Sequence, residues 1–180
     1  MRFSGLLCAA AIAVAGSAAH AEDITIEVRA LTATGVGKEI GTLRAVDTGK
    51  GLRVVPRLAG LTPGIHGFHV HQNPSCRARG ADGKTGPGLA AGGHYDPAGS
   101  GHHEGPAGKG HLGDLPALVV DAGGAARKAV TAPRLKVANL WGRAIVIHAG
   151  GDNYSDQPKA LGGGGARVAC ATIVKAKKKM

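Results

Sequence analysis

Short runs of alternating apolar and polar residues, each ended by glycine, constrain the fold of this 180-residue chain more than any other feature. From Asp23 the segment ITIEVRALTATG alternates and then turns, and GVGKEIGTLRAVDTGKGLRVVPRLAGL continues the pattern. Alternation turns one face of a strand toward a core, and glycine permits the tight turns of antiparallel strands. Further strands are predicted at 64–71, 117–121, 125–131, 143–149 and 166–174. Many short strands at this spacing favour a sandwich or a barrel.

Two glycine-rich stretches, 72–116 and 150–165, lack a strand pattern and are predicted to be loops. One brief helical turn is predicted at 133–140. Loops as long as these are usually functional or disordered in a compact domain. Most of the histidines that follow residue 21 lie in the first stretch or in the strand that enters it. A disordered linker has no reason to collect imidazoles, so a functional loop is expected.

The first 21 residues have the pattern of a cleaved secretory signal peptide. Arg2 is followed by the apolar run LLCAAAIAVAG and then by a small-residue site, Ala19-His20-Ala21. The run is too short to span a bilayer, which argues against a membrane anchor. We therefore expect residues 1–21 to be a signal peptide and residues 22–180 to be one exported domain without a membrane anchor.

Export leaves two cysteines, Cys76 and Cys170, because Cys8 lies in the expected signal peptide. An even pair in an oxidising compartment suggests a disulfide, and two free buried thiols are the alternative. Closing a loop of this length would remove roughly 4–5 kcal/mol of unfolded-state entropy.

The formal net charge is +10, and it is +9 once Arg2 is removed. Such an excess attracts anions of any kind. Part of it lies in the tail KAKKKM, which is expected to be a solvated end of the chain. No aromatic stacking run and no nucleic-acid motif accompanies the charge, so no nucleic-acid partner is expected.

The histidines of GFHVH predict a metal site. Residues of equal parity share a face of a strand, so His69 and His71 point the same way and can reach one ion. His66 shares the other face with apolar residues and is expected to be a packed histidine bonded to the backbone. The remaining donors are His94, His103, His111, Asp114 and His148. Seven donors exceed one tetrahedral site, and imidazoles with one carboxylate suit zinc or copper, so two metals are predicted.

These segments resemble copper/zinc superoxide dismutase, specifically the secreted bacterial type. HGFHVH, AGGHYDPAGSGHHEGPAGKGHLGDLP and VIHAGGDNYSDQPKALGGGGARVACATI stand in the family's order with its spacings, from about Ile24 to Val174. The resemblance implies an all-β fold, an eight-stranded Greek-key β-barrel (an immunoglobulin-like sandwich) with long metal-site loops. It also implies a periplasmic antioxidant enzyme that disproportionates superoxide to oxygen and hydrogen peroxide. Copper would carry the redox step, because zinc cannot change its oxidation state.

The resemblance further implies a set of metal ligands. Copper would be held by His69, His71, His94 and His148. Zinc would be held by His94, His103, His111 and Asp114. His94 would thus bridge both metals, and it would also supply a proton during catalysis. His103 matches the ligand position, and its neighbour His102 is expected to be exposed.

Four residues outside the ligand set also match the family. Asp152 matches the carboxylate that links a copper histidine to a zinc histidine. Arg167 matches the arginine that holds the anionic substrate beside the open copper position. Cys76 and Cys170 match the disulfide that ties the long loop to the strand of Arg167. Lys109, in the loop before His111, could join Arg167 in steering superoxide, although an ordinary solvated lysine is the alternative.

Three other functions stay open. A metal-storage or metal-delivery module would bind copper without turnover, but it would leave Arg167 without a role. A zinc hydrolase with an open His₃ site would need a general base, for which the loops offer only Glu104. A purely structural β-domain would leave the clustered donors unexplained. Superoxide is the expected partner, and a homodimer is left open.

Overall fold

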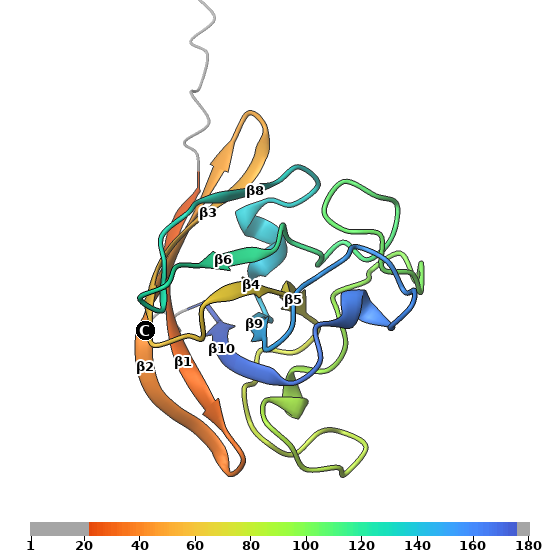
Figure 1. The fold of residues 1–180 in the computed structure, drawn as a ribbon. Coiled ribbons are helices and arrows are strands. Elements are labelled where there is room, and N and C mark those ends of the chain that lie inside the picture. Colours follow the sequence, from red (N-terminus) through yellow and green to blue (C-terminus); the bar gives the residue numbers. More distant parts are fainter. Residues whose placement is uncertain (1–21, 176–180) are drawn as a thin grey trace, which may run out of the picture.

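The computed structural model describes residues 22–175. The expected signal peptide, residues 1–21, and the last lysines of the tail, residues 176–180, lie outside the described residues. In the described part, antiparallel strands form a curled sheet, and long loops gather beside β5 (Figure 1). Between residues 22 and 175 no helix has the length and apolar character that crossing a membrane requires.

Between residues 22 and 175 the fold consists of ten strands and three short 3₁₀ helices. The strands are β1 (Asp23–Thr32), β2 (Gly35–Thr48), β3 (Gly51–Ala59), β4 (Gly64–His66), β5 (Phe68–His71), β6 (Leu118–Val120), β7 (Ala125–Ala126), β8 (Val130–Ala132), β9 (Arg143–His148) and β10 (Arg167–Ile173). The 3₁₀ helices are η1 (Leu89–Ala91), η2 (Val137–Leu140) and η3 (Leu161–Gly163). The main sheet has eight strands in the order β5-β9-β10-β1-β2-β3-β7, with β8 also on β3, and β4 pairs with β6.

The core forms from the inward positions of these strands. In β2 and β3 the side chains of Leu43, Leu52 and Val54 are fully buried, whereas the neighbouring Arg44 and Arg53 are exposed. This alternation is the pattern expected of a sheet with one solvated face. The all-β barrel predicted from the sequence is thereby confirmed.

Two predictions of a single continuous strand are wrong, because each segment forms two strands in the structure. The predicted strand 64–71 is divided at Gly67, because β4 pairs with β6 whereas β5 pairs with β9. The Gly67 backbone instead bonds to the β9 end: its N–H donates to the Gly150 carbonyl, and its carbonyl accepts from the His148 N–H. The predicted strand 125–131 is likewise divided into β7 and β8. The predicted helical turn is confirmed as η2, which spans only Val137–Leu140.

The two predicted loops are confirmed, and their only regular elements are η1 and η3. Cys76, near the start of the first loop, forms a disulfide with Cys170 of β10, with the two Cα atoms 5.8 Å apart. The alternative of two free thiols is therefore wrong. The bond joins positions 94 residues apart in the sequence, so it fixes the first loop against the strand that carries Arg167.

Candidate metal centre

The free edge of β5 is extended by two segments of the first loop. The Tyr95 N–H donates to the Val70 carbonyl, and the Val70 N–H donates to the Gly113 carbonyl, each at 2.8 Å. These bonds create backbone bridges that set His94 opposite His71 and Asp114 opposite His69. Residues far apart in the loop are thus held by the same strand that carries the HxH pair.

The donors predicted from the sequence meet in two overlapping groups. In each group, one ligand atom per residue lies within 4.8 Å of the others, and every member is buried. The first group is His69, His71, His94 and His148. The second group is His69, His94, His103 and Asp114. His111 is outside the second group, but its Nδ1 atom lies 3.6 Å from Oδ1 of Asp114.

Hydrogen bonds to backbone carbonyls determine which ring nitrogen of His71 and of His148 is left for a metal. Nδ1 of His71 donates to the Gly92 carbonyl at 2.9 Å, and Nδ1 of His148 donates to the Gly165 carbonyl at 3.1 Å. The lone pairs of these two rings therefore lie on the Nε2 atoms, which are 3.4 Å apart. A backbone acceptor on one ring nitrogen is the usual way in which a protein fixes the tautomer of a metal-binding histidine.

Asp152 fixes two further rings. Its Oδ2 atom accepts a hydrogen bond from Nε2 of His69 at 2.8 Å, and its Oδ1 atom accepts one from Nε2 of His103 at 2.7 Å. In their neutral forms both rings carry the lone pair at Nδ1, and that of His103 lies 2.9 Å from Oδ2 of Asp114. The carboxylate is itself held by the Tyr154 N–H, which donates to Oδ1 at 2.8 Å. The structure thus places Asp152 between a member of the first group and a member of the second.

Most of the unsatisfied buried atoms of the protein point into this site. Among residues 22–175, six buried side-chain nitrogen or oxygen atoms have no hydrogen-bond partner. Five belong to the predicted ligands: His69 Nδ1, His94 Nε2, His103 Nδ1, His111 Nδ1 and Asp114 Oδ2. Of these, His103 Nδ1 and Asp114 Oδ2 lie 2.9 Å apart and pair with each other when the His103 ring is protonated. A buried polar atom without a partner costs about 1–3 kcal/mol, so this gathering of buried donors calls for a common partner. Metal ions fit this set, since all five atoms carry lone pairs once the ligands are deprotonated.

Burial keeps several of these rings neutral. It lowers the pKa of His69 to about 3 and the pKa of His148 to about 4, so both lone pairs are available at neutral pH. His103 differs: burial acts to lower its pKa, but the Asp114 and Asp152 carboxylates outweigh burial and raise it to about 9. Asp114 is the reverse case, because burial acts to raise its pKa and the neighbouring His103 and His94 hold it well below the usual range.

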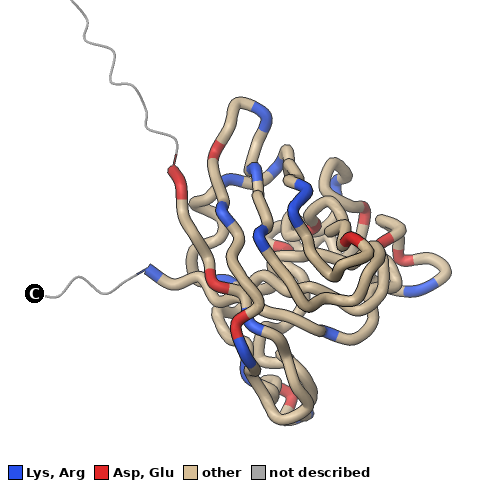
Figure 2. The backbone as a smooth tube through the Cα atoms, turned by 60° about the vertical axis from the view of Figure 1, so that its left-hand side comes forward, with Lys and Arg blue, Asp and Glu red and all other residues tan. Residues whose placement is uncertain are grey.

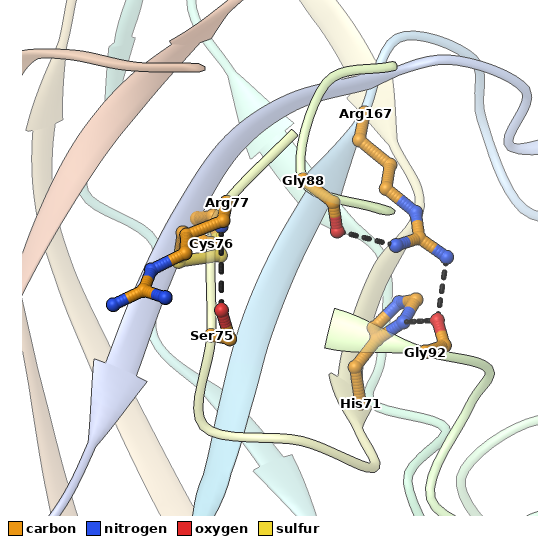
Figure 3. The surroundings of a disulfide bond; sticks show 8 residues. His71, Ser75, Cys76, Arg77, Gly88, Gly92 and Arg167 are labelled. Atoms are coloured by element: carbon orange, nitrogen blue, oxygen red, sulfur yellow. Dashed lines mark hydrogen bonds between the residues drawn. A yellow bond between two sulfur atoms is a disulfide. The ribbon is translucent and has the colours of Figure 1, made fainter. Parts of the chain in front are cut away.

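Arg167, at the start of β10, lies beside the first group (Figure 3). Its guanidinium donates to the carbonyls of Gly88 and Gly92, each at 2.6 Å. The Gly92 carbonyl also accepts from His71, so one backbone oxygen orients both a predicted ligand and the predicted substrate-binding arginine. The disulfide lies at the base of this loop and keeps it near β10.

Two residues that organise the site had not been predicted. Arg134 follows β8 and donates to three carbonyls of the loop that carries His111: to Pro106 at 3.3 Å, to Gly110 at 3.0 Å and to His111 itself at 2.5 Å. Gly162 in η3 lies against Asp152 and His103, where a Cβ atom would collide with the bridging carboxylate. Arg134 belongs to no quoted motif, and Gly162 lies in a quoted segment whose glycines had been given no individual role.

Three further expectations can be compared with the structure. The structural role of His66 is confirmed: the ring is buried, with nitrogens 2.7 Å from the His148 carbonyl oxygen and 2.8 Å from the Thr62 carbonyl oxygen. His102 is exposed as expected. Lys109 is also exposed, and only its backbone N–H has a described contact, with the Glu104 carboxylate. Its steering role stays a prediction.

Comparisons with known proteins agree with this geometry. Residues 40–173 match the family model described as copper/zinc superoxide dismutase. Superoxide dismutase [Cu-Zn] 1 of Salmonella typhimurium is 50% identical over 177 residues, which are 97% of this chain and 100% of the relative. The solved Cu/Zn superoxide dismutase of Brucella abortus has 51% identity and a TM-score of 0.81, covering 84% of this chain and 99% of that one. A solution structure described as the monomeric copper, zinc superoxide dismutase of Salmonella enterica has 52% identity and a TM-score of 0.75, with the same coverage.

Proposed function

The chain belongs to the copper/zinc superoxide dismutases of bacteria, and from this premise we infer how its own residues divide the work. It disproportionates superoxide to oxygen and hydrogen peroxide, with copper and zinc as cofactors. The metal-storage, zinc-hydrolase and purely structural alternatives are thereby set aside. The residue assignments below are our proposal.

We assign copper to His69, His71, His94 and His148, and zinc to His94, His103, His111 and Asp114. The observation that carries the assignment is the convergence of buried donors in two overlapping groups in the metal centre. His69 belongs to both groups of donors, but its Nε2 atom is occupied by Asp152, so a single free nitrogen remains for a single ion. His111 then completes the zinc set, because its buried Nδ1 atom has no other partner among the described residues.

His94 is assigned as the bridge between the two metals. Its Nδ1 atom lies 3.1 Å from Oδ1 of Asp114, and its Nε2 atom is buried without a partner. No backbone acceptor fixes either nitrogen of this ring among the described residues, in contrast to His71 and His148. Both nitrogens of His94 can therefore coordinate a metal ion once the ring has lost its N–H proton.

The metals supply a one-electron redox couple at copper and a fixed positive charge at zinc. The chain supplies the rest. Arg167 binds the superoxide anion through the N–H groups that its carbonyl partners leave free, since a guanidinium has five donors in a fixed fork. His94 holds and releases a proton at Nε2 for the peroxide product. Asp152 keeps the rings of His69 and His103 in position throughout.

Loss of one proposed copper ligand tests the assignment. His148→Ala should abolish superoxide consumption while zinc stays bound, because His148 lies only in the first group of donors. Metal analysis of the purified variant, with superoxide consumption measured before and after a copper chelator, gives both readouts. His102→Ala is the matched control, since His102 is exposed. Full activity in His148→Ala would refute the proposed copper ligands.

We propose that residues 1–21 are a signal peptide that is removed on export to the periplasm. The support is the sequence pattern of this segment together with the bacterial relatives. Cell fractionation followed by N-terminal sequencing of the purified protein tests this proposal. A mature chain that begins near Glu22 in the periplasmic fraction is expected, and a cytoplasmic chain that retains Met1 would contradict it.

For the oligomeric state we propose a homodimer through the β4–β6 pair. Ile65 and Val119 face each other across these strands and are 59% and 41% exposed. An exposed apolar pair of this kind is typical of an interaction surface. Sedimentation equilibrium should give a dimer that Ile65→Lys dissociates, whereas a monomer at all concentrations would overturn the proposal. The Salmonella enterica relative is described as monomeric.

A further inference from the structure

Positive charge also lies far from Arg167, on β3. In the sheet order, four strands separate β3 from β5. Figure 2 turns the side of β1, β2 and β3 toward the reader and shows Lys and Arg positions spread along these strands. Two of the four arginines on these strands have an acidic partner, and Arg53 and Arg57 have none among the described residues. Arg44 is paired with Asp23, and Arg29 with Glu27.

The outer edge of β3 has a gap in its hydrogen-bonding ladder. β7 and β8 pair with this edge in one common register, Leu58 opposite Ala126 and Val54 opposite Val130. The segment 127–129 between them is not part of a strand. Pro56, which has no N–H for a ladder bond, lies in the middle of the facing stretch of β3.

Two arginines face each other at this gap. The common register places Arg127 opposite Arg57, and both side chains are exposed. Both line one groove of about 460 Å³, whose remaining walls are Val55, Pro56, Leu58 and Ala59. Among residues 22–175 neither guanidinium has a hydrogen-bond or ion-pair partner. On the β2 side the residue opposite Arg57 is the neutral Thr42.

Like charges that face each other across a sheet destabilise it. The two exposed arginines repel each other weakly, and an anion between them would relieve this repulsion. We propose that Arg57 and Arg127 form a binding site for a phosphate group. A phosphate monoester carries about −1.5 to −2 at neutral pH, which matches two guanidinium groups, whereas a carboxylate carries only one charge. Arginine forks also fit phosphate oxygens in a bidentate manner.

A titration of the mature, metal-loaded protein with copper in its reduced state tests the site. Inorganic phosphate is added at constant ionic strength, and backbone amide signals are followed by NMR. The amides of residues 55–58 and 126–128 should shift and saturate, and Arg57→Gln and Arg127→Gln should each weaken the affinity at least tenfold. Arg53→Gln is the matched control, since Arg53 is an exposed arginine of the same strand that faces Thr131. Equal affinities in all four proteins, or shifts confined to residues around Arg167, would overturn the proposal.

The source of the phosphate is distinguished by three probes: inorganic phosphate, glucose 6-phosphate and vesicles that contain phosphatidic acid. Arg57-dependent binding of any of them supports the site, and the tightest one identifies the source. Acetate bound as tightly as phosphate would exclude phosphate selectivity. As a second measurement, Arg57→Gln and Arg127→Gln should each raise the melting temperature in the absence of phosphate. The double variant should melt at the same temperature as either single variant, because one substitution already removes the repulsion. Lower melting temperatures in both variants would contradict the proposed repulsion.

Discussion

Gly162 shows how a single residue without a functional group can control the metal centre. Its φ of +70° lies in the region that favours glycine, and a Cβ atom there would collide with Oδ1 of Asp152 and lie 2.8 Å from Nε2 of His103. The bridging carboxylate can keep both of its hydrogen bonds only while this space is empty. A glycine is therefore required by the chemistry of its neighbours as well as by its backbone conformation.

The variant Gly162→Ala should lower zinc affinity about 10–100-fold, which is typical of losing a group that orients a metal ligand. Zinc competition against a chromogenic chelator measures this loss. Gly163→Ala is the control for backbone strain, because its φ of +78° is similar and a Cβ atom there would meet only Lys159, at 3.7 Å or more. An equal loss of zinc affinity in both variants would assign the effect to the backbone and not to Asp152.

His103 makes zinc uptake dependent on pH. Its pKa of about 9 in the metal-free protein means that the ring is protonated at neutral pH, whereas zinc binds only the neutral ring. Zinc therefore displaces one proton, and its affinity should rise about tenfold per pH unit up to about pH 9. Zinc titrations of the metal-free protein at several pH values test this directly. A constant affinity between pH 7 and pH 9 would show that His103 is already neutral.

Among the larger elements, the loop that carries His111 depends on a residue outside it. Arg134 closes this loop with three bonds to its carbonyls, and losing such a donor leaves buried acceptors at a cost of about 1–3 kcal/mol each. Arg134→Gln should reduce zinc affinity about tenfold while copper stays bound, and Arg134→Lys should restore part of the loss. Arg77→Gln, a charge change at an exposed site, is the control. Unchanged zinc affinity in Arg134→Gln would show that the loop is held by its other contacts.

The strands and the metal donors could be predicted from the sequence because each has a local signal. Alternation marks β1, β2 and β3, strand parity marks His69 and His71 as a pair, and the family resemblance separates the remaining donors from His66 and His102. The break at Gly67 had no such signal, since it results from pairing with two different strands, β6 and β9. Arg134 and Gly162 were missed for the same reason. Their importance arises from contacts with His111 and Asp152, which only the folded chain brings near them.

For the molecule as a whole, the excess of positive charge should govern how fast superoxide arrives. The chain without Arg2 carries a formal charge of +9, and Arg167 concentrates part of it beside the copper site. Salt shortens the range of such attraction from about 30 Å at 0.01 M to about 3 Å at 1 M. The catalytic rate constant kcat/KM should therefore fall as salt rises, and Arg167→Gln should lower it about tenfold and flatten the salt dependence.

Pulse radiolysis over a range of ionic strengths measures this dependence. Lys109→Gln shows whether that lysine contributes, and Arg77→Gln removes the same charge elsewhere on the surface. A rate that does not change with salt would rule out electrostatic steering in this enzyme.

The carboxylate of Asp152 also connects the two proposed metal sites, because it contacts one ring of each. Ordering the His69 ring for one ion necessarily orders the His103 ring for the other, because both rings share one acceptor. By linkage, if bound zinc changes the affinity for copper by some factor, bound copper changes the affinity for zinc by the same factor.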